Sequence, residues 1–427
     1  MPRQFLKHRF WFSEGRLQRS LQAPLQHLAG PLVLAIALTL GTAPRAVAQA
    51  LPPAVRFPFL ADPLQDDPLD PLLPRPIVSR PPSPLELYAL EQSLDQLALE
   101  AEALAEAGEL EQARDIWRRE IRLRRLLGVE RELAAIDRVG QWLRDSTATQ
   151  DLQLYALRLD EIRAGLVLPE DQSRLERMAE TYVVLGAIDA AAEIRRDLAD
   201  AARLADNTAE YRRQLEVLAA LRADWFYFPA AAETYGELVA LNQVEANPDD
   251  ERRYLTLEAE NLEQAQDFAG AIARQQRLLT LYQSDESLWP QIAPLQHRVA
   301  QNYLALGDET TAARQFQVAY TNAIDQGQLE VATNAIDDLA DIYKSLGRWA
   351  DVGYLYEQLL VVAQQSHSAF TMMMAYDQLG QVHEQLGATP SALAAYREGL
   401  VLARVLGTRQ AYFEEQIERL TGAASQW

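Results

Sequence analysis

The sequence predicts an all-α protein, an α-solenoid of about eight helix-turn-helix repeats followed by a C-terminal capping helix. Three observations support this prediction. The 427 residues are rich in Leu, Ala, Glu, Gln and Arg, which favour helix. From Pro84 onward, apolar residues recur at i, i+3, i+4 and i+7, the spacing of one helix face. The pattern then repeats about every 40 residues, as expected of stacked helical units.

The first 48 residues have the order of an export signal. A basic segment that includes Lys7 and Arg19 precedes an apolar run over 28–40 and an A-x-A cleavage pattern at 46–48. The apolar run is short for a membrane span, which needs about 20 residues. We therefore expect residues 1–48 to be a Sec-type signal peptide, with the mature chain in a periplasm or a thylakoid-type lumen. An uncleaved membrane anchor is the alternative.

The next segment is rich in proline. Eleven of the 35 residues over 51–85 are proline, and neither a helix nor a central strand tolerates that density. We expect residues 49–84 to be a disordered, partly extended linker between the cleavage site and the folded part of the chain.

The repeat occupies residues 85–427. Three segments align without gaps: VAQNYLALGDETTAARQFQVAY (299–320), LADIYKSLGRWADVGYLYEQLL (339–360) and LGQVHEQLGATPSALAAYREGL (379–400). Their glycines mark the turn inside each unit: Gly307, Gly347 and Gly387. Toward the N-terminus the same turn is expected at Gln266, Phe226, Gly186, about Thr147, and Gly108. The stretch AYFEEQIERL after the last unit is expected to be the capping helix.

A second series of turns lies near the midpoints between the first. Gly and Asn commonly end helices in the left-handed conformation, so we expect these residues to separate one unit from the next. The series consists of Gly128, Asn207, Asn247, Gly327 and Gly407.

The turn signature resembles that of tetratricopeptide repeats, L-G-x-x-x-x-A-x-x-x-[YF]. It appears as Leu306-Gly307 with Ala312 and Phe316, and again after Gly387. The period is longer than the usual one of about 34 residues and is similar to that of the kinesin-light-chain subtype. The resemblance implies a right-handed superhelix whose first helices line a concave groove for peptides or helices of other proteins.

By analogy with that family, the groove positions lie about three, six and ten residues before each turn. Most of them are acidic here, and Lys344 is one of the exceptions. We expect a basic, Arg-rich protein partner, attracted by opposite charge, although the acids could equally be a solvated helix face. His297 is expected to face the same groove. The acidic candidates are Glu176, Glu180, Glu260, Glu263, Asp337, Asp341, Asp377 and Glu384.

Composition and motifs argue against other classes of function. A net charge of −21 disfavours nucleic-acid binding, and the chain has no cysteine for a thiolate metal site or a nucleophile. Phosphate-binding, dinucleotide and hydrolase signatures are missing, and the few histidines are dispersed. We expect a non-catalytic scaffold or assembly factor with no cofactor and no metal. The alternative is an envelope component that contacts polysaccharide or lipid.

The run ADWFYFPAAAETYGEL (224–239) places four aromatics at one turn. Alignment with the other repeats predicts that Trp225 and Phe228 are buried and that Tyr227 points outward. Phe226 replaces the turn glycine, where a left-handed conformation costs about 1–2 kcal/mol, so we expect a remodelled turn. Phe226 and Tyr227 are therefore candidates for an exposed contact patch.

Overall fold

The computed structural model describes residues 51–66, 68–73, 80–245 and 247–424. Pro53–Trp427 forms one unit and Met1–Pro52 another, so the export signal predicted over 1–48 lies outside the described residues. No strand occurs in the described part of the chain. Its helices also include none that combines the length and the apolar character needed to cross a bilayer.

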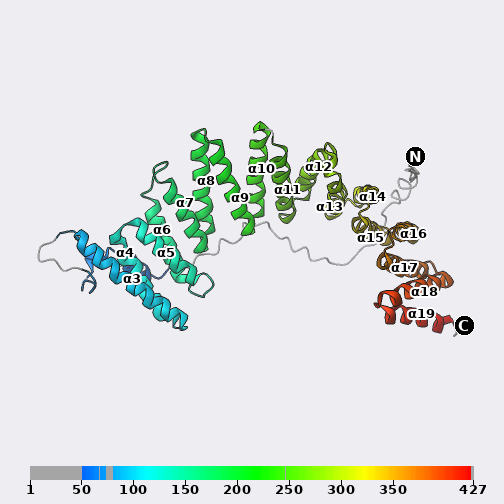
Figure 1. The fold of residues 1–427 in the computed structure, drawn as a ribbon, viewed down its shortest axis with the longest axis horizontal. Helices are drawn as coiled ribbons and strands as arrows, with labels where there is room; N and C mark the ends of the chain where they lie inside the picture. Colours follow the sequence, from blue (N-terminus) through cyan, green and yellow to red (C-terminus); the bar gives the residue numbers. More distant parts are fainter. Residues whose placement is uncertain (1–50, 67, 74–79, 246, 425–427) are drawn as a thin grey trace, which may run out of the picture. The chain divides into compact units, whose positions relative to one another are not determined.

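Sixteen helices form eight consecutive pairs in the described ranges (Figure 1). The fold class is therefore the predicted all-α solenoid. The pairs are α3 (Pro84–Glu106) with α4 (Leu110–Arg124), α5 (Val129–Leu143) with α6 (Thr149–Arg163), α7 (Gln172–Val184) with α8 (Ile188–Leu204), α9 (Thr208–Asp224) with α10 (Phe228–Glu245), α11 (Pro248–Gln264) with α12 (Phe268–Gln283), α13 (Ile292–Ala305) with α14 (Glu309–Asp325), α15 (Leu329–Ser345) with α16 (Trp349–Gln365), and α17 (Ala369–Gln385) with α18 (Thr389–Leu406).

Burial of one apolar stripe per helix joins the pairs into a continuous core. One buried cluster contains Phe316 of α14, Leu339 of α15, Tyr356 of α16 and Leu379 of α17, so it extends across three consecutive pairs. Each helix packs against the next in the chain, and no pair could bury its stripe alone.

The small residue seven positions before a turn allows the two helices of a pair to approach closely. At Gly380 a Cβ atom would lie 2.4 Å from the ring of Tyr396, the aromatic position of the same unit's signature. Ala300 and Ala340 occupy the same position in the two preceding units and are fully buried. The signature is therefore a packing rule: a small side chain opposite an aromatic one.

The turn inside each pair has one recurring geometry. Gly307 has a φ of 80°, its N–H donates to Leu304 O, and the next N–H donates to Tyr303 O. Phe226 has a φ of 64°, its N–H donates to Ala223 O, and the N–H of Tyr227 donates to Arg222 O. The expectation of a remodelled turn at Phe226 is wrong, because two hydrogen bonds to the end of α9 hold the phenylalanine in the left-handed conformation.

The predicted burial of Trp225 is also wrong. Trp225 is 43% exposed. The residues at the same position in three other repeats, Leu306, Leu346 and Leu386, are 46–50% exposed. These residues are the C-caps of their helices. Leu185 has the same position at the end of α7 but is buried beside Gly140, so burial here depends on the neighbouring repeat. Phe228 is half-buried, and Tyr227 is exposed as predicted.

The second series of turns follows the prediction at Gly128, Gly327 and Gly407, which have positive φ. At the two asparagines it does not. Asp206 has the left-handed conformation with a φ of 54°, and Asn207 caps the next helix by accepting from Glu210 N. Asn247 has a φ of −93° and likewise caps α11. Short polar side chains serve better here as N-caps.

The least regular turn lies in the second pair. α5 ends at Leu143 and α6 begins at Thr149, so a turn is present near Thr147 as expected. Neither Thr147 nor its neighbours have positive φ. Instead, Ser146 N–H donates to Leu143 O, and the Ser146 hydroxyl donates to the same carbonyl.

A single helix, α19 (Gln410–Ala424), follows the eighth pair, as predicted. Its Phe413 is fully buried against Gly399 and Tyr396 of α18. The capping helix therefore covers the apolar face that the eighth pair would otherwise expose.

The proline-rich segment differs from the expected disordered linker. Pro53–Leu60 forms helix α2, and the 3₁₀ helix η1 follows over Pro63–Gln65. Phe59 and Leu73 are buried. Proline density argues against helix, and α2 contains two prolines. Pro53 lies at the helix start, where its missing N–H costs little, whereas Pro58 lies inside the helix. We call residues 53–73, of which 67 is not described, the strap.

Candidate protein-interaction surface

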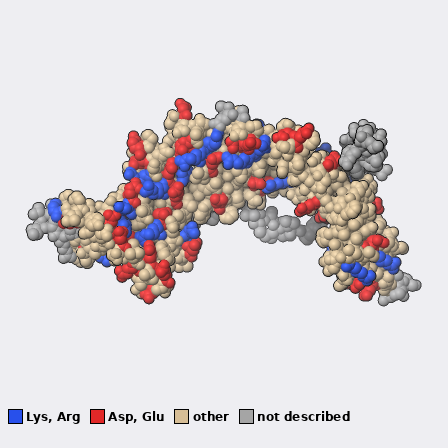
Figure 2. Space-filling view, in the orientation of Figure 1, with Lys and Arg blue, Asp and Glu red and all other residues tan. Residues whose placement is uncertain are grey.

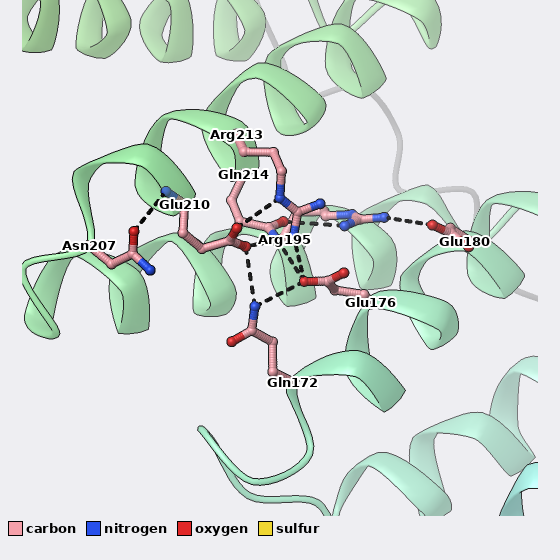
Figure 3. Close-up of polar contacts among 8 residues, drawn as sticks. All are labelled: Gln172, Glu176, Glu180, Arg195, Asn207, Glu210, Arg213 and Gln214. Atoms are coloured by element: carbon pink, nitrogen blue, oxygen red, sulfur yellow. Dashed lines mark hydrogen bonds and ion pairs between the residues drawn. The ribbon is translucent and has the colours of Figure 1, made fainter.

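The predicted groove acids lie on or beside the first helices of their pairs, where many take part in ion pairs between repeats. Figure 3 shows the clearest case, at α7 and α9. Arg213 Nη2 of α9 lies 2.6 Å from a Glu176 oxygen of α7 and 2.6 Å from a Glu210 oxygen of its own helix. Gln214 Nε2 donates to the same two carboxylates, at 3.1 and 2.7 Å.

In this cluster, the Glu176 and Glu210 carboxylates both pair with the Arg213 guanidinium. The hydrogen bond from Arg213 lowers the pKa of Glu210, and its bond to Glu210 raises the pKa of Arg213. Gln172 Nε2 adds a third donor to Glu176, at 3.1 Å. The network in Figure 3 contains three carboxylates, Glu176, Glu180 and Glu210, and two guanidinium groups, Arg195 and Arg213, so it keeps one net negative charge.

Glu180 lies one helical turn further along α7. It is 70% exposed, and its nearest cation is Arg195 Nη2 of α8, at 3.5 Å. Arg195 is itself buried and donates to Gln214 Oε1 at 3.2 Å. Of the three carboxylates in Figure 3, Glu180 therefore has the longest ion-pair distance to a guanidinium group.

Glu260 and Glu263 on α11 meet one arginine of the next repeat. Arg298 of α13 lies 3.2 Å from Glu260 and 2.6 Å from Glu263. Glu263 also accepts from Gln275 at 2.6 Å and from Asn302 at 2.7 Å. This second cluster again has two carboxylates for one guanidinium.

Asp377 and Glu384 on α17 contact the capping helix and the residue before it. Arg409 and the Tyr412 hydroxyl donate to buried Asp377 at 2.8 and 2.7 Å. Burial, with the bond to Asp377, raises the pKa of Tyr412 to about 12. Arg419 and the Tyr396 hydroxyl donate to Glu384, at 2.7 and 2.6 Å. These two acids are neutralised within the protein.

His297 of α13 pairs with an acid of the next repeat. Its Nε2 lies 2.9 Å from Asp338 Oδ2 of α15, and its ring packs on Phe316 with centroids 5.3 Å apart. Burial raises the pKa of Asp338, but the hydrogen bonds from His297 and Gln301 outweigh it, and the net pKa is lowered. His297 thus has a partner inside the protein.

Asp337 and Asp341 lie on α15, close to Lys344. Asp337 accepts from the Tyr356 hydroxyl at 2.8 Å. Asp341 is 74% exposed and pairs with Lys344 of the same helix at 3.0 Å. Among the predicted acids that form ion pairs, Asp341 and Glu180 have the most exposed side chains.

Sequence reasoning identified the acids but missed their arginine partners. Arg213 pairs with Glu176, and Arg253 of α11 pairs with Glu216 of α9 in the same way. Arg213 and Arg253 are 40 residues apart, one repeat period, so the repeat alignment could have identified these arginines. Figure 2 shows the result, with basic atoms beside acidic atoms over α7 to α12.

The aromatic turn is a second exposed feature. Phe226 is 78% exposed and Tyr227 is 44% exposed, and the Phe226 ring meets the Phe228 ring edge-on at 5.8 Å. Burial and Asp189 raise the pKa of Tyr227. The turn presents an apolar surface with one hydroxyl.

No metal site is evident in the described ranges: no group of three His, Asp or Glu residues there is placed to hold an ion. The acids discussed above are held by arginine, lysine, tyrosine and amide groups rather than left facing one another.

Comparison with known proteins gives structural neighbours only. No family model matches the chain, and no curated protein matches it. Solved structures to which it is similar include BtubC (BKLC) from P. vanneervenii, at 18% identity and a TM-score of 0.35, covering 55% of this chain and 92% of that one. Aspartyl phosphate phosphatase F from Bacillus subtilis has 14% identity, a TM-score of 0.37 and 83% coverage of both chains.

A third neighbour is a Rap protein complexed with Competence and Sporulation Factor, at 13% identity and a TM-score of 0.30, covering 78% of this chain and 99% of that one. These likenesses are too distant to carry a function. The helix pairs, the turn geometry and the small-to-aromatic packing define the class of this protein: an α-solenoid of tetratricopeptide-like repeats.

Proposed function

We propose that this chain is a non-catalytic scaffold or assembly factor that binds a basic, Arg-rich segment of another protein along its first helices. The observation that supports the proposal most is the charge imbalance of two clusters. Glu176 and Glu210 share Arg213, and Glu260 and Glu263 share Arg298. A cationic partner side chain would complete each cluster without disturbing the pairs already made.

The exposed acids extend this surface. Glu180 and Asp341 are 70% and 74% exposed, and each has at most one basic contact. The chain as a whole carries a net charge of −21, which would steer a basic partner toward it. Asp377 and Glu384 are internally neutralised, so we assign them to holding α19 rather than to the partner.

Salt-dependent affinity purification of the chain from its own compartment tests this proposal. The wild-type chain is compared with E180Q/D341N, which removes the two exposed acids. The matched control is E309Q, because Glu309 is an exposed acid on the second helix α14. We expect one basic protein to co-purify at low salt and to be lost severalfold with E180Q/D341N but not with E309Q. An acidic partner, or retention indifferent to salt and to both variants, would contradict the proposal.

The aromatic turn favours a second candidate function, that of an envelope component contacting polysaccharide or lipid. Trp225, Phe226 and Tyr227 are exposed together on one turn, and aromatic side chains with a polar tip suit such interfaces. Retention of the chain by envelope polysaccharide or by lipid vesicles, abolished by F226A/Y227A and without any co-purifying protein, would support this function over the first.

Export by a Sec-type signal to a periplasm or a thylakoid-type lumen is part of the same proposal. It rests on the order of basic, apolar and A-x-A segments over 1–48. N-terminal sequencing of the chain recovered from its native host tests it. A mature N-terminus at Gln49 is expected, and an intact Met1 on a chain in the cytoplasmic fraction would contradict it.

A further inference from the structure

The strap binds the first two repeats through a combination of charge and leucine contacts. Asp70 accepts two hydrogen bonds from Arg119 of α4, both of 2.8 Å. Asp66 accepts two from Arg122 of the same helix, both of 2.5 Å. Two-point pairing between carboxylate and guanidinium fixes orientation as well as position, so the strap is held in one register.

Apolar contacts accompany the ion pairs. Leu73 is 4% exposed and packs in a cluster with Leu90 and Leu94 of α3 and Leu123 of α4. At the other end of the strap, the Phe59 ring lies 5.7 Å from the ring of Tyr155 on α6, with the Arg125 guanidinium 4.7 Å from its centroid. The strap therefore links the second helices of the first two pairs.

The surface beneath the strap is unusually basic for an acidic protein. α4 reads LEQARDIWRREIRLR, with five arginines in 15 residues. Two further basic contacts to the strap come from this helix and the turn after it, since Arg122 and Arg125 also donate to Ala61 O, each at 3.4 Å. We call Arg119, Arg122, Arg125, Leu90, Leu94 and Leu123 the strap site.

The strap sequence is itself repetitive. It contains the triplet Asp-Pro-Leu three times, at 62–64, 67–69 and 70–72. Among the aspartates of the strap that the structure describes, Asp66 and Asp70 make the two-point pairs. The Asp62 carboxylate caps its own 3₁₀ turn by accepting from Leu64 N at 3.0 Å. Asp70 is the first residue of one triplet, and Asp66 directly precedes another.

We propose that the strap site is a recognition site for acidic, leucine-containing peptide segments of a partner protein, and that the strap is its ligand within the same chain. The argument is charge complementarity together with leucine burial: a partner segment with two carboxylates and a following leucine presents the groups that the strap presents. The surface is distinct from the acidic first-helix surface of the proposed function and takes the opposite charge.

The strap has a large advantage over such a partner, since it is joined to α3 through the short segment 74–83. A short tether gives a local concentration of roughly millimolar. A free peptide of the same affinity is therefore excluded from the wild-type chain at micromolar concentration. Weakening the strap by two charges should open the site to the peptide.

Fluorescence anisotropy with a labelled peptide of residues 61–73, ADPLQDDPLDPLL, tests the proposal on the full chain. The chain carrying D66N/D70N is expected to bind the peptide at least tenfold more tightly than the wild-type chain. Adding R119Q/R122Q should abolish that binding. The matched control is D62N, which changes a carboxylate that contacts only the strap's own turn and should leave the wild-type behaviour unchanged.

Two results would overturn the proposal. One is a folded D66N/D70N chain, helical by circular dichroism, that binds the peptide no better than wild type, because the strap would then be a structural element only. The other is binding that survives R119Q/R122Q. If D66N/D70N does not fold, hydrogen exchange is measured on the wild-type chain instead. Millimolar peptide should displace the strap and so speed amide exchange over residues 57–65. Unchanged exchange would refute the proposal.

Discussion

Arg213 on α9 donates to Glu176 on α7 at 2.6 Å, and the two residues are 37 positions apart in the chain. The contact joins the first helices of two neighbouring repeats. The pair Arg253 and Glu216 has the same separation one repeat later. The repeat therefore specifies ion pairs between units as well as apolar packing within them.

Loss of the Arg213 guanidinium should weaken the junction between the third and fourth pairs. R213Q leaves Glu176 and Glu210 facing each other without their shared cation. Because Arg213 is 46% exposed, we expect a local loss of only about 0.5–1 kcal/mol. Hydrogen exchange of α9 should speed up by a few fold. The control R203Q removes an exposed arginine that pairs within its own helix and should leave α9 unchanged. Equal exchange in both variants would contradict a role in joining repeats.

Asp377 should be critical for the capping helix. It is 2% exposed and accepts from Arg409 and Tyr412. D377A leaves both donors without that acceptor, and breaking a buried pair of this kind costs about 3 kcal/mol. We expect α19 to lose most of its hydrogen-exchange protection while α13 keeps its own. E398Q, an exposed change on α18, is the control; a protected α19 in D377A would disprove the assignment.

The left-handed turns predict opposite effects of two reciprocal substitutions. G307A places a side chain at a φ of 80° and should destabilise the turn by about 1–2 kcal/mol. F226G relieves the same strain at a φ of 64° and should stabilise by up to about 1 kcal/mol, less the lost edge contact with Phe228. Thermal unfolding monitored by circular dichroism measures both. Destabilisation by F226G would show that the aromatic turn is held by packing that outweighs its backbone strain.

Glu86 should give the chain a specific acid sensitivity. Hydrogen bonds from Arg80, with those of the Ser83 cap, lower the pKa of Glu86 to about 2 from 4.5. A lowered pKa in the folded state means that this carboxylate stabilises α3 fully above pH 4.5 and loses its contribution as the pH falls toward 2. Carboxyl titration by NMR should give the low value in wild type and a higher one in R80Q. A Glu86 pKa near 4.5 in wild type would refute the pairing.

Much of the fold could be predicted because the repeat imposes local rules. A glycine at the turn and a small residue opposite an aromatic one are constraints on backbone and packing, and both are visible in Gly307 and in Gly380 with Tyr396. Where a residue departed from the rule, as at Phe226, neighbouring hydrogen bonds kept the geometry. Tertiary context there overrode the preference of a single residue.

The parts that could not be predicted depend on contacts between distant segments. The exposure of Trp225 could not be predicted, because the equivalent Leu185 is buried and an apolar stripe does not reveal which of its positions a neighbouring repeat covers. The strap was missed because its order comes from Arg119 and Arg122, 49 and 56 residues away from Asp70 and Asp66. The acidic groove positions were visible in the sequence, but their arginine partners lie on the next repeat, and pairing decides which acids remain available.

Photocrosslinking in the native compartment tests the central proposal most directly. A photoreactive residue replaces Glu180 or Asp341 on the first helices, Glu309 on a second helix, or Tyr227 on the aromatic turn. We predict that positions 180 and 341 crosslink to the same basic protein and that position 309 does not. Crosslinks to protein only from position 309, or to lipid or polysaccharide only from position 227, would contradict a scaffold that binds its partner along the first helices.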